Sequence, residues 1–171
     1  MKIKTERLTL RTMEQWDLEW ILDMLKNDEI KKTYMIPDFP SEEAAVKLAQ
    51  RLITLSQEGK KLIVGIVLGE RLIGFMNEQE VVGGSIEMGY VIHPDCHGKG
   101  YMTEAFLAMI EALWGMGYAG VTAGAFAENA ASIRVMEKCG MKRIEKKETI
   151  EYRGRVHECI YYAIGKTEEK A

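Results

Sequence analysis

Residues 94–105, which read PDCHGKGYMTEA, decide the fold of this chain. A strand-like run over 85–92 ends just before them, and an apolar helical stretch over about 100–116 begins within them. The two glycines let backbone N–H groups converge without interference from a Cβ atom. The first turn of a helix adds N–H groups that have no intrahelical partner, together with the positive end of the helix dipole. The segment therefore predicts a turn that binds an anion such as pyrophosphate, with Lys99 adding positive charge and Thr103 a hydroxyl group.

Two well-known phosphate-binding patterns do not occur in the sequence. Neither G-x-x-x-x-G-K-[ST] nor G-x-G-x-x-G is found, so Walker-type and Rossmann-type nucleotide sites are excluded. A G-x-G turn before a helix also occurs in proteins without any ligand. The turn by itself therefore leaves open a tight turn and helix start with no binding role.

The spacing of apolar residues predicts the elements on both sides of this turn. Strands are expected from alternation, helices from a period of 3.6, and a hairpin from two strand-like runs joined by a two-residue turn. In chain order we expect a strand over 4–12, a helix from Asp17, a helix from the N-cap Ser41 to about Gln57, a hairpin of 62–68 and 71–76, a strand over 85–92, a helix over 100–116, a strand over 120–126, a helix over 129–139, and strands over 142–152 and 154–165. This order predicts an α/β layered domain around a mixed sheet, in which Gly89 marks a bulge or a close backbone approach.

The composition bounds the class of protein. A chain of 171 residues with 47% hydrophobic and 29% charged residues is typical of one globular domain. A formal net charge of −3 argues against the broad positive field of a nucleic-acid-binding protein, so we expect no nucleic-acid partner. The same charge is compatible with a cationic substrate such as an amine.

Cysteine usage and apolar segments predict the location. The three cysteines are odd in number and lack C-x-x-C spacing, which indicates thiols of a reducing compartment and no zinc site. Residues 1–7 turn polar before a signal-peptide core could form, and the longest apolar stretch, 105–116, is short and contains Glu111. We therefore expect a cytoplasmic protein with no bound metal and no membrane contact.

Four motifs follow one another along the chain. Residues 5–11 read TERLTLR, residues 87–94 read EMGYVIHP, residues 97–105 read HGKGYMTEA, and residues 128–141 read ENAASIRVMEKCGM. Their order and spacing resemble the GNAT superfamily of N-acetyltransferases, and especially its ribosomal-protein N-acetyltransferase-like branch. The resemblance extends over essentially the whole chain.

The resemblance implies both a fold and an activity. The implied fold is the GNAT acyl-CoA N-acyltransferase fold, with three αβα layers around a central mixed, mostly antiparallel sheet of about seven strands. The implied activity is transfer of an acetyl group from acetyl-CoA to a primary amine, either a small molecule or a protein N-terminus. We expect residues 1–171 to form a single domain, with a core over about 5–165 and a tail over 166–171, and a homodimer is compatible with it.

The resemblance also implies a cofactor site. The loop over 96–101 would hold the CoA pyrophosphate through backbone N–H groups, and the strand around 90–93 would pair with the pantetheine arm. An N–H group near Val91 or Ile92 would polarise the thioester carbonyl. The residues expected to bind acetyl-CoA are Val91, Ile92, His93, His97, Gly98, Lys99, Gly100, Tyr101, Met102, Thr103, Asn129 and Ser132.

The sequence departs from the family pattern at three positions. Asp95 stands where Gln or Arg is common, so we expect its side chain to point away from the pyrophosphate. His97 replaces the tryptophan usual in this branch, and Met136 replaces the tyrosine that protonates the leaving thiolate in many relatives. Ser132 is the candidate proton donor in place of that tyrosine, although Asn129 and Ser132 also suit an N-cap and a helix start.

Direct transfer to an amine also requires a base, because an alkylamine with a pKa of about 10 is mostly protonated at pH 7. Glu87 is the candidate, since it lies on the strand that leads to the expected acetyl site. Glu78 and Glu80 are its rivals, and a solvent-facing strand residue is the alternative for Glu87. Glu104 suits a first helical turn by its charge alone.

Two functions from other classes remain alternatives. A non-catalytic module that senses acyl-CoA would share the fold, and a general nucleotide-binding domain would respond to ATP at least as strongly as to CoA. Direct transfer through a ternary complex is preferred to a covalent intermediate, because no cysteine has a visible activating partner.

Overall fold

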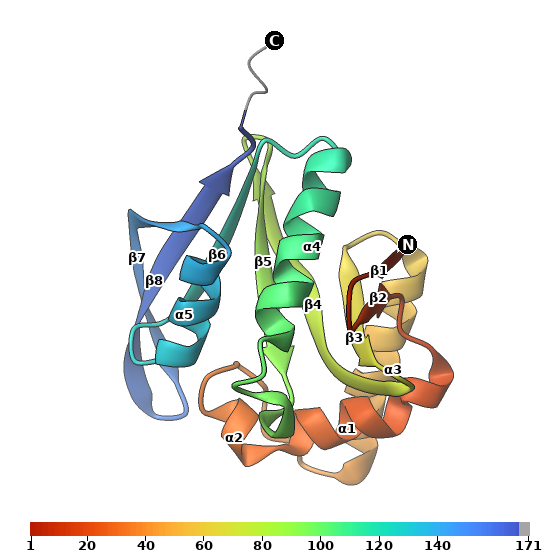
Figure 1. Ribbon diagram of the computed structural model, residues 1–171. Coiled ribbons are helices and arrows are strands. Elements are labelled where there is room, and N and C mark those ends of the chain that lie inside the picture. The colour runs from red at the N-terminus through yellow and green to blue at the C-terminus, as the bar shows by residue number, and fades with distance from the viewer. Residues whose placement is uncertain (168–171) are drawn as a thin grey trace. The chain divides into compact units, whose positions relative to one another are not determined.

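The computed structural model describes residues 1–167, so most of the predicted tail over 166–171 lies outside the described residues (Figure 1). Its strands are β1 Lys2–Lys4, β2 Thr9–Arg11, β3 Ile63–Leu68, β4 Arg71–Val82, β5 Ser85–Ile92, β6 Gly120–Phe126, β7 Lys142–Tyr152 and β8 Arg155–Gly165. Its α-helices are α1 Leu18–Lys26, α2 Asp28–Lys31, α3 Glu42–Glu58, α4 Tyr101–Gly115 and α5 Ala130–Lys138, and two 3-10 turns, η1 Gln15–Asp17 and η2 Pro94–Cys96, complete the set. The strands form a mixed sheet in the order β1-β2-β3-β4-β5-β6-β8-β7, which confirms the predicted α/β class.

The prediction was wrong about the first strand. The expected strand over 4–12 is two short antiparallel strands, with Lys4 opposite Thr9. The chain reverses between them because the Thr5 N–H donates to the Leu8 carbonyl at 2.9 Å and the Leu8 N–H donates to the Thr5 hydroxyl oxygen at 3.0 Å. This turn gives the sheet eight strands in place of the expected seven.

A four-residue helix, α2, was also missed. Its N-cap is Asn27, whose side-chain oxygen accepts hydrogen bonds from the N–H groups of Glu29 and Ile30 at 3.0 and 3.2 Å. A helix this short has too few residues to show an apolar period. The longer helix α3 follows the prediction, because the Ser41 side chain accepts a hydrogen bond from the Ala44 N–H and Gly59 ends the helix with φ of +68°.

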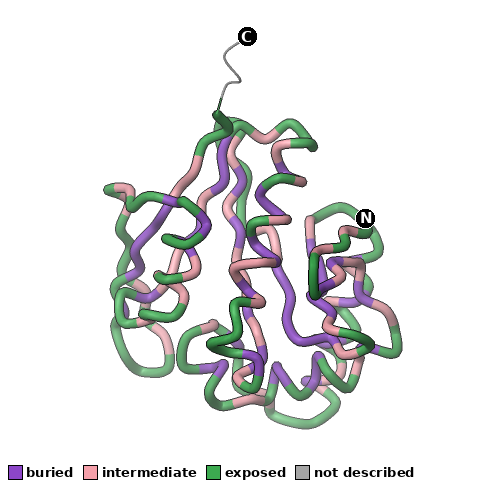
Figure 2. Tube along the Cα trace, in the orientation of Figure 1, coloured by how far each residue is buried: buried purple, intermediate pink, exposed green. Residues whose placement is uncertain are grey.

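The chain forms two compact units, and β4, β5 and α4 each contribute residues to both. Unit 1 consists of Met1–Asn77 and Tyr90–Ala105. In it, β1 to β4 are paired in antiparallel fashion, and β3 together with the first half of β4 is buried nearly throughout (Figure 2). Helices α1 and α3 pack against each other, and their apolar residues form one core with Met13, Phe75 and Val91.

Two polar contacts hold the start of unit 1 in place. Arg11 pairs with the fully buried Asp17 through two hydrogen bonds of 2.7 and 3.0 Å. The buried Ser56 hydroxyl accepts from the Met13 N–H at 2.9 Å and donates to the Ile63 carbonyl at 3.0 Å. Both contacts satisfy polar groups that burial would otherwise leave unpaired, which is costly in free energy.

Unit 2 consists of Glu78–Gly89 and the chain from Phe106 onward. In it, β5 runs parallel to β6, β6 is antiparallel to β8, and β8 forms a long hairpin with β7, while α5 packs beside β6 (Figure 1). Phe126, Cys159 and Tyr161 form an apolar cluster in this unit. The Tyr161 ring fills the place of the missing side chain of Gly124, where an added Cβ would lie 2.6 Å from the ring.

We predict that Gly74→Ala destabilises the protein by about 2 kcal/mol or more, because overpacking a tight contact costs energy. A Cβ atom on Gly74 would lie 2.4 Å from the Val91 carbonyl oxygen, so β4 and β5 would have to move apart. Urea unfolding measures the effect. Gly115→Ala is the matched control: an added Cβ there meets nothing within 4 Å among the described residues, so it should leave stability unchanged or raise it by up to about 1 kcal/mol. Equal stability of the two variants would contradict the close approach.

Candidate active site

The predicted anion-binding turn connects β5 to α4 within unit 1. The strand ladder ends where the His93 N–H donates to the Ile73 carbonyl at 2.7 Å, and η2 follows. Gly98 and Gly100 then adopt φ of +71° and +79°, a left-handed conformation that favours glycine. Helix α4 begins at Tyr101, so the N–H groups of its first turn lie directly after the two glycines.

A carboxylate holds this turn to the N-terminus of the chain. Glu104 accepts hydrogen bonds from the Thr5 hydroxyl at 2.6 Å, from the Arg7 N–H at 2.8 Å and from the Arg7 Nε at 2.6 Å. The Arg7 Nη1 also donates to the Lys99 carbonyl at 2.9 Å, and its guanidinium carbon lies 4.5 Å from the centre of the Tyr101 ring. We call Thr5, Arg7 and Glu104 the N-terminal clamp.

The clamp corrects the expectation for Glu104. First-turn charge alone was expected, yet the carboxylate connects two segments about a hundred residues apart in sequence. Desolvation by itself would raise the Glu104 pKa, but the hydrogen bonds from Thr5 and Arg7 outweigh it and lower the pKa. The sequence indicated only that Thr5, Arg7 and Glu104 lie in the family motifs over 5–11 and 97–105, and not that they contact one another.

The two predicted histidines of the turn are bonded within the protein. The buried His93 lies with its Nε2 2.8 Å from the Asp23 carboxylate, while its Nδ1 accepts from the Asp95 N–H at 3.2 Å. The His97 Nε2 lies 3.0 Å from the Ile92 carbonyl oxygen. These contacts hold the end of β5 and the turn in shape, so any contact of His93 and His97 with a cofactor remains a prediction.

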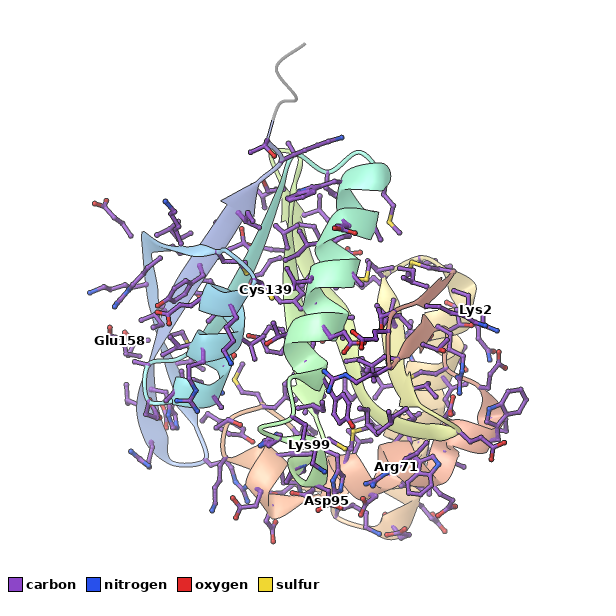
Figure 3. All side chains as sticks on the ribbon, in the orientation of Figure 1. Lys2, Arg71, Asp95, Lys99, Cys139 and Glu158 are labelled. Atoms are coloured by element: carbon purple, nitrogen blue, oxygen red, sulfur yellow. The ribbon has the colours of Figure 1, made fainter. Side chains whose placement is uncertain are left out.

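Asp95, the first departure from the family pattern, has its charge balanced by a neighbour. Its carboxylate lies 3.6 Å from the Arg71 guanidinium, and Figure 3 labels both residues together with Lys99. The exposed Lys99 side chain remains at the surface as a positive charge beside the two glycines, whereas the Arg7 guanidinium, in a side chain that is 41% exposed, is paired with Glu104.

Strand β5 changes character along its length. Ile86 and Met88 are buried, as alternation requires, but the next buried residue is Val91. The alternation of buried residues therefore shifts by one position between Met88 and Val91. A bulge produces such a shift. The parallel pairing with β6 covers Ser85–Glu87 opposite Gly120–Thr122, and among the described residues it extends no further along either strand.

In unit 2, Asn129 has the role of an N-cap. Its side-chain oxygen accepts a hydrogen bond from the Ser132 N–H at 3.1 Å at the start of α5. Further along this helix Met136, which stands at the family's tyrosine position, is fully buried. The predicted contacts of Asn129 and Ser132 with acetyl-CoA remain predictions.

The candidate base Glu87 is not a solvent-facing strand residue. Its side chain is 16% exposed, and its carboxylate lies 3.2 Å from the Lys146 Nζ on β7. Lys146 also lies 3.5 Å from the rival carboxylate Glu80 and 4.2 Å from the centre of the Tyr161 ring. The Tyr161 hydroxyl donates to Glu148 at 2.5 Å. We call these five residues the Lys146 cluster.

A second contact missed from the sequence anchors the start of α5. The buried His157 stacks on Phe126 with ring centres 4.2 Å apart, and its Nδ1 lies 2.6 Å from the Glu128 carboxylate. Glu128 directly precedes the N-cap Asn129, so β8 and α5 are joined at this point. No local pattern indicates this pair.

Within residues 1–167, no three or more His, Cys, Asp or Glu side chains are grouped so that they could hold a metal ion. None of the helices in this part of the chain is long and apolar enough to cross a membrane.

Comparison with known proteins identifies the family. Residues 7–142 match the model of the acetyltransferase (GNAT) domain. The chain is 27% identical over 146 residues to YoaA of Bacillus subtilis, named an uncharacterized N-acetyltransferase, and this covers 82% of each chain. A crystal structure of a GNAT-family acetyltransferase from Bacillus anthracis is 28% identical, with a TM-score of 0.82 over 96% of this chain and 98% of that one.

RimL, a ribosomal L7/L12 alpha-N-protein acetyltransferase solved in complex with coenzyme A, has a TM-score of 0.81 over 96% of this chain and 98% of its own. At 18% identity it shows the fold alone. The chain belongs to the GNAT acetyltransferase family, so the predicted fold and the class of N-acetyltransferase are confirmed.

The N-terminal clamp predicts a dependence of stability on pH. Because the folded-state pKa of Glu104 is lowered below its unfolded value of about 4.3, this carboxylate contributes stability above that value and loses it as the pH falls through the folded pKa. We expect Glu104→Gln to lower the free energy of unfolding at pH 7, and the difference from wild type to shrink towards pH 3. Urea unfolding at several pH values measures it, with Glu70→Gln, at an exposed glutamate in the turn before β4, as control. A difference that stays constant from pH 7 to pH 3 would contradict the assignment.

Proposed function

We propose that the protein transfers an acetyl group from acetyl-CoA to a primary amine by direct attack in a ternary complex. The observation that carries the proposal is the turn of Gly98 and Gly100 at the start of α4, held in place by the N-terminal clamp. A turn held open in this way suits an anion, because its backbone N–H groups need no rearrangement on binding. The GNAT family and the CoA complex of RimL support acetyl-CoA as the donor.

In this proposal the backbone of residues 97–103 binds the CoA pyrophosphate, and Lys99 adds positive charge. Val91 and Ile92 offer main-chain groups to the pantetheine arm, as a strand edge does for an extended ligand. An N–H group at Val91 or Ile92 stabilises the oxyanion that forms on the thioester carbonyl. Asn129 adds a contact to the pantetheine arm.

The chemistry removes two protons from the acceptor nitrogen. The ammonium group of the acceptor first loses a proton to the Glu87 carboxylate, which later releases it to solvent. The neutral nitrogen then forms a bond to the acetyl carbon, and the bond between that carbon and sulfur breaks. Ser132, the proposed donor, gives its hydroxyl proton to the CoA thiolate and takes the second proton of the nitrogen in its place. The products are an N-acetylated amine and CoA, with the acceptor amine either a small molecule or a protein N-terminus.

The cysteines support direct transfer. All three are buried thiols, and burial raises the pKa of Cys139 to about 12 and also raises the pKa of Cys159. Since the thiolate is the nucleophilic form, these two side chains are poorly suited to carry an acetyl group. We further propose that the chain acts as one catalytic domain in the cytoplasm, where thiols stay reduced.

A matched pair of glycine substitutions tests the cofactor site. Gly98 and Gly59 both have positive φ, +71° and +68°, and an added Cβ on either meets nothing within 4 Å among the described residues. Alanine at either position should therefore cost about 1 to 2 kcal/mol of backbone strain. We expect acetyl-CoA and CoA to raise the melting temperature of wild type and Gly59→Ala by about 5 to 10 °C at 100 times Kd, while Gly98→Ala loses most of this shift.

The controls separate the alternatives. ATP should give a smaller shift than CoA, and a shift at least as large would favour a general nucleotide-binding domain. CoA binding without acetylation of any amine in a broad panel would favour an acyl-CoA sensor. A folded wild type that shows no response to CoA would overturn the cofactor assignment.

A further inference from the structure

The Lys146 cluster contains an ammonium group in a site that suits a substrate amine. Lys146 lies over the face of the Tyr161 ring, 4.2 Å from its centre, with the carboxylates of Glu87 and Glu80 at 3.2 and 3.5 Å. The face of an aromatic ring attracts an ammonium cation, and neighbouring carboxylates add charge attraction to it. In this structure, the cation bound in that arrangement is the side chain of Lys146.

The Tyr161 ring, on which the ammonium group lies, is held rigidly. The Tyr161 ring lies against Gly124 of β6, where any side chain would collide with it, and its hydroxyl donates to Glu148 at 2.5 Å. The ring therefore cannot easily turn away when Lys146 leaves. Neighbouring strands thus fix both the face and the edge of the ring.

The charges around Lys146 exceed what it neutralises. Glu80, Glu87 and Glu148 all act on this single ammonium group. Desolvation would lower the pKa of Lys146, yet the hydrogen bond with Glu87 and the three carboxylates raise it, so the side chain stays charged. The three carboxylates and Lys146 together carry a formal charge of −2. This charge attracts a further cation and repels an anionic group.

The pairing also conflicts with the proposed role of Glu87. While the Glu87 carboxylate binds the ammonium group of Lys146, it cannot at the same time take a proton from the ammonium group of the acceptor. At 36% exposure of its side chain, Lys146 has a route to solvent. Catalysis through Glu87 is therefore best served when Lys146 moves away and the acceptor takes its place.

We propose that Lys146 is a specificity-determining residue that occupies the position of the acceptor's ammonium group in the free enzyme, so that the acceptor is a cationic amine without a neighbouring carboxylate. The acceptor displaces Lys146 from Glu87 and lies on the Tyr161 ring. This inference rests on the proposed acetyl transfer and names the substrate class of the same site.

Three acceptors of equal chain length test the charge preference: 1,4-diaminobutane, butylamine and 4-aminobutanoate. For wild type we expect kcat/KM to be highest for the diamine and at least tenfold lower for the zwitterionic 4-aminobutanoate. Lys146→Met removes the internal cation, so KM for the diamine should fall about fivefold or more. Lys146→Arg keeps a cation in place and should leave KM near the wild-type value.

Lys147→Met is the matched control. Lys147 is the next residue on β7, is 60% exposed and lies 4.0 Å from Glu158, so its loss changes the net charge equally without touching Glu87. It should leave KM for all three amines unchanged. If Lys147→Met lowers KM as much as Lys146→Met, or if 4-aminobutanoate is used as well as the diamine, the inference is overturned.

Equilibrium dialysis with radiolabelled 1,4-diaminobutane separates this inference from the proposed function. Tighter binding by Lys146→Met and weaker binding by Tyr161→Leu, in a protein that acetylates no amine, would keep the ammonium site and reject the enzyme. Acetylation of amines with diamine binding that is the same in wild type, Lys146→Met and Tyr161→Leu would keep the enzyme and reject the ammonium site.

Discussion

The described site depends on a carboxylate that receives three hydrogen bonds. Glu104 lies in the first turn of α4, and Thr5 and Arg7 bring the N-terminal segment to it. Arg7 then reaches on to the Lys99 carbonyl and the Tyr101 ring, so the turn that carries Gly98 and Gly100 is braced from one side. The two glycines supply the backbone conformation, and the clamp prevents the turn from relaxing out of it. A loop that is prepared in this way loses little conformational entropy when an anion binds.

Local elements were predictable because their signals are local. The bounds of β5 and β6 match the predicted strands 85–92 and 120–126, since apolar alternation bounded by turn residues marks both. Ser41 and Asn129 begin α3 and α5 as expected, because their side chains accept hydrogen bonds from the helix N-terminus. The reversal at Thr5 was missed, since its alternation on both sides reads as one continuous strand.

The contacts between distant residues were not predictable from one sequence. Nothing in the spacing of residues pairs Glu104 with Arg7, Glu87 with Lys146 or Glu128 with His157. Each pair is created by the way strands and helices pack, and two of them change the role assigned to a residue. Glu104 holds the N-terminal segment to α4, and Glu87 forms an ion pair with Lys146. Family motifs indicated where the important residues are, whereas the structure indicated what each of them contacts.

The proposed function requires the backbone of residues 97–103 to bind the pyrophosphate of acetyl-CoA. Amide chemical shifts from a ¹H–¹⁵N NMR titration with acetyl-CoA report on these N–H groups directly. We expect the largest shift changes at the amides of Gly98, Gly100 and the first turn of α4, and much smaller changes with acetyl-pantetheine, which lacks the pyrophosphate. Binding that leaves those amides unchanged, or that shifts them equally with acetyl-pantetheine, would contradict pyrophosphate binding by this backbone.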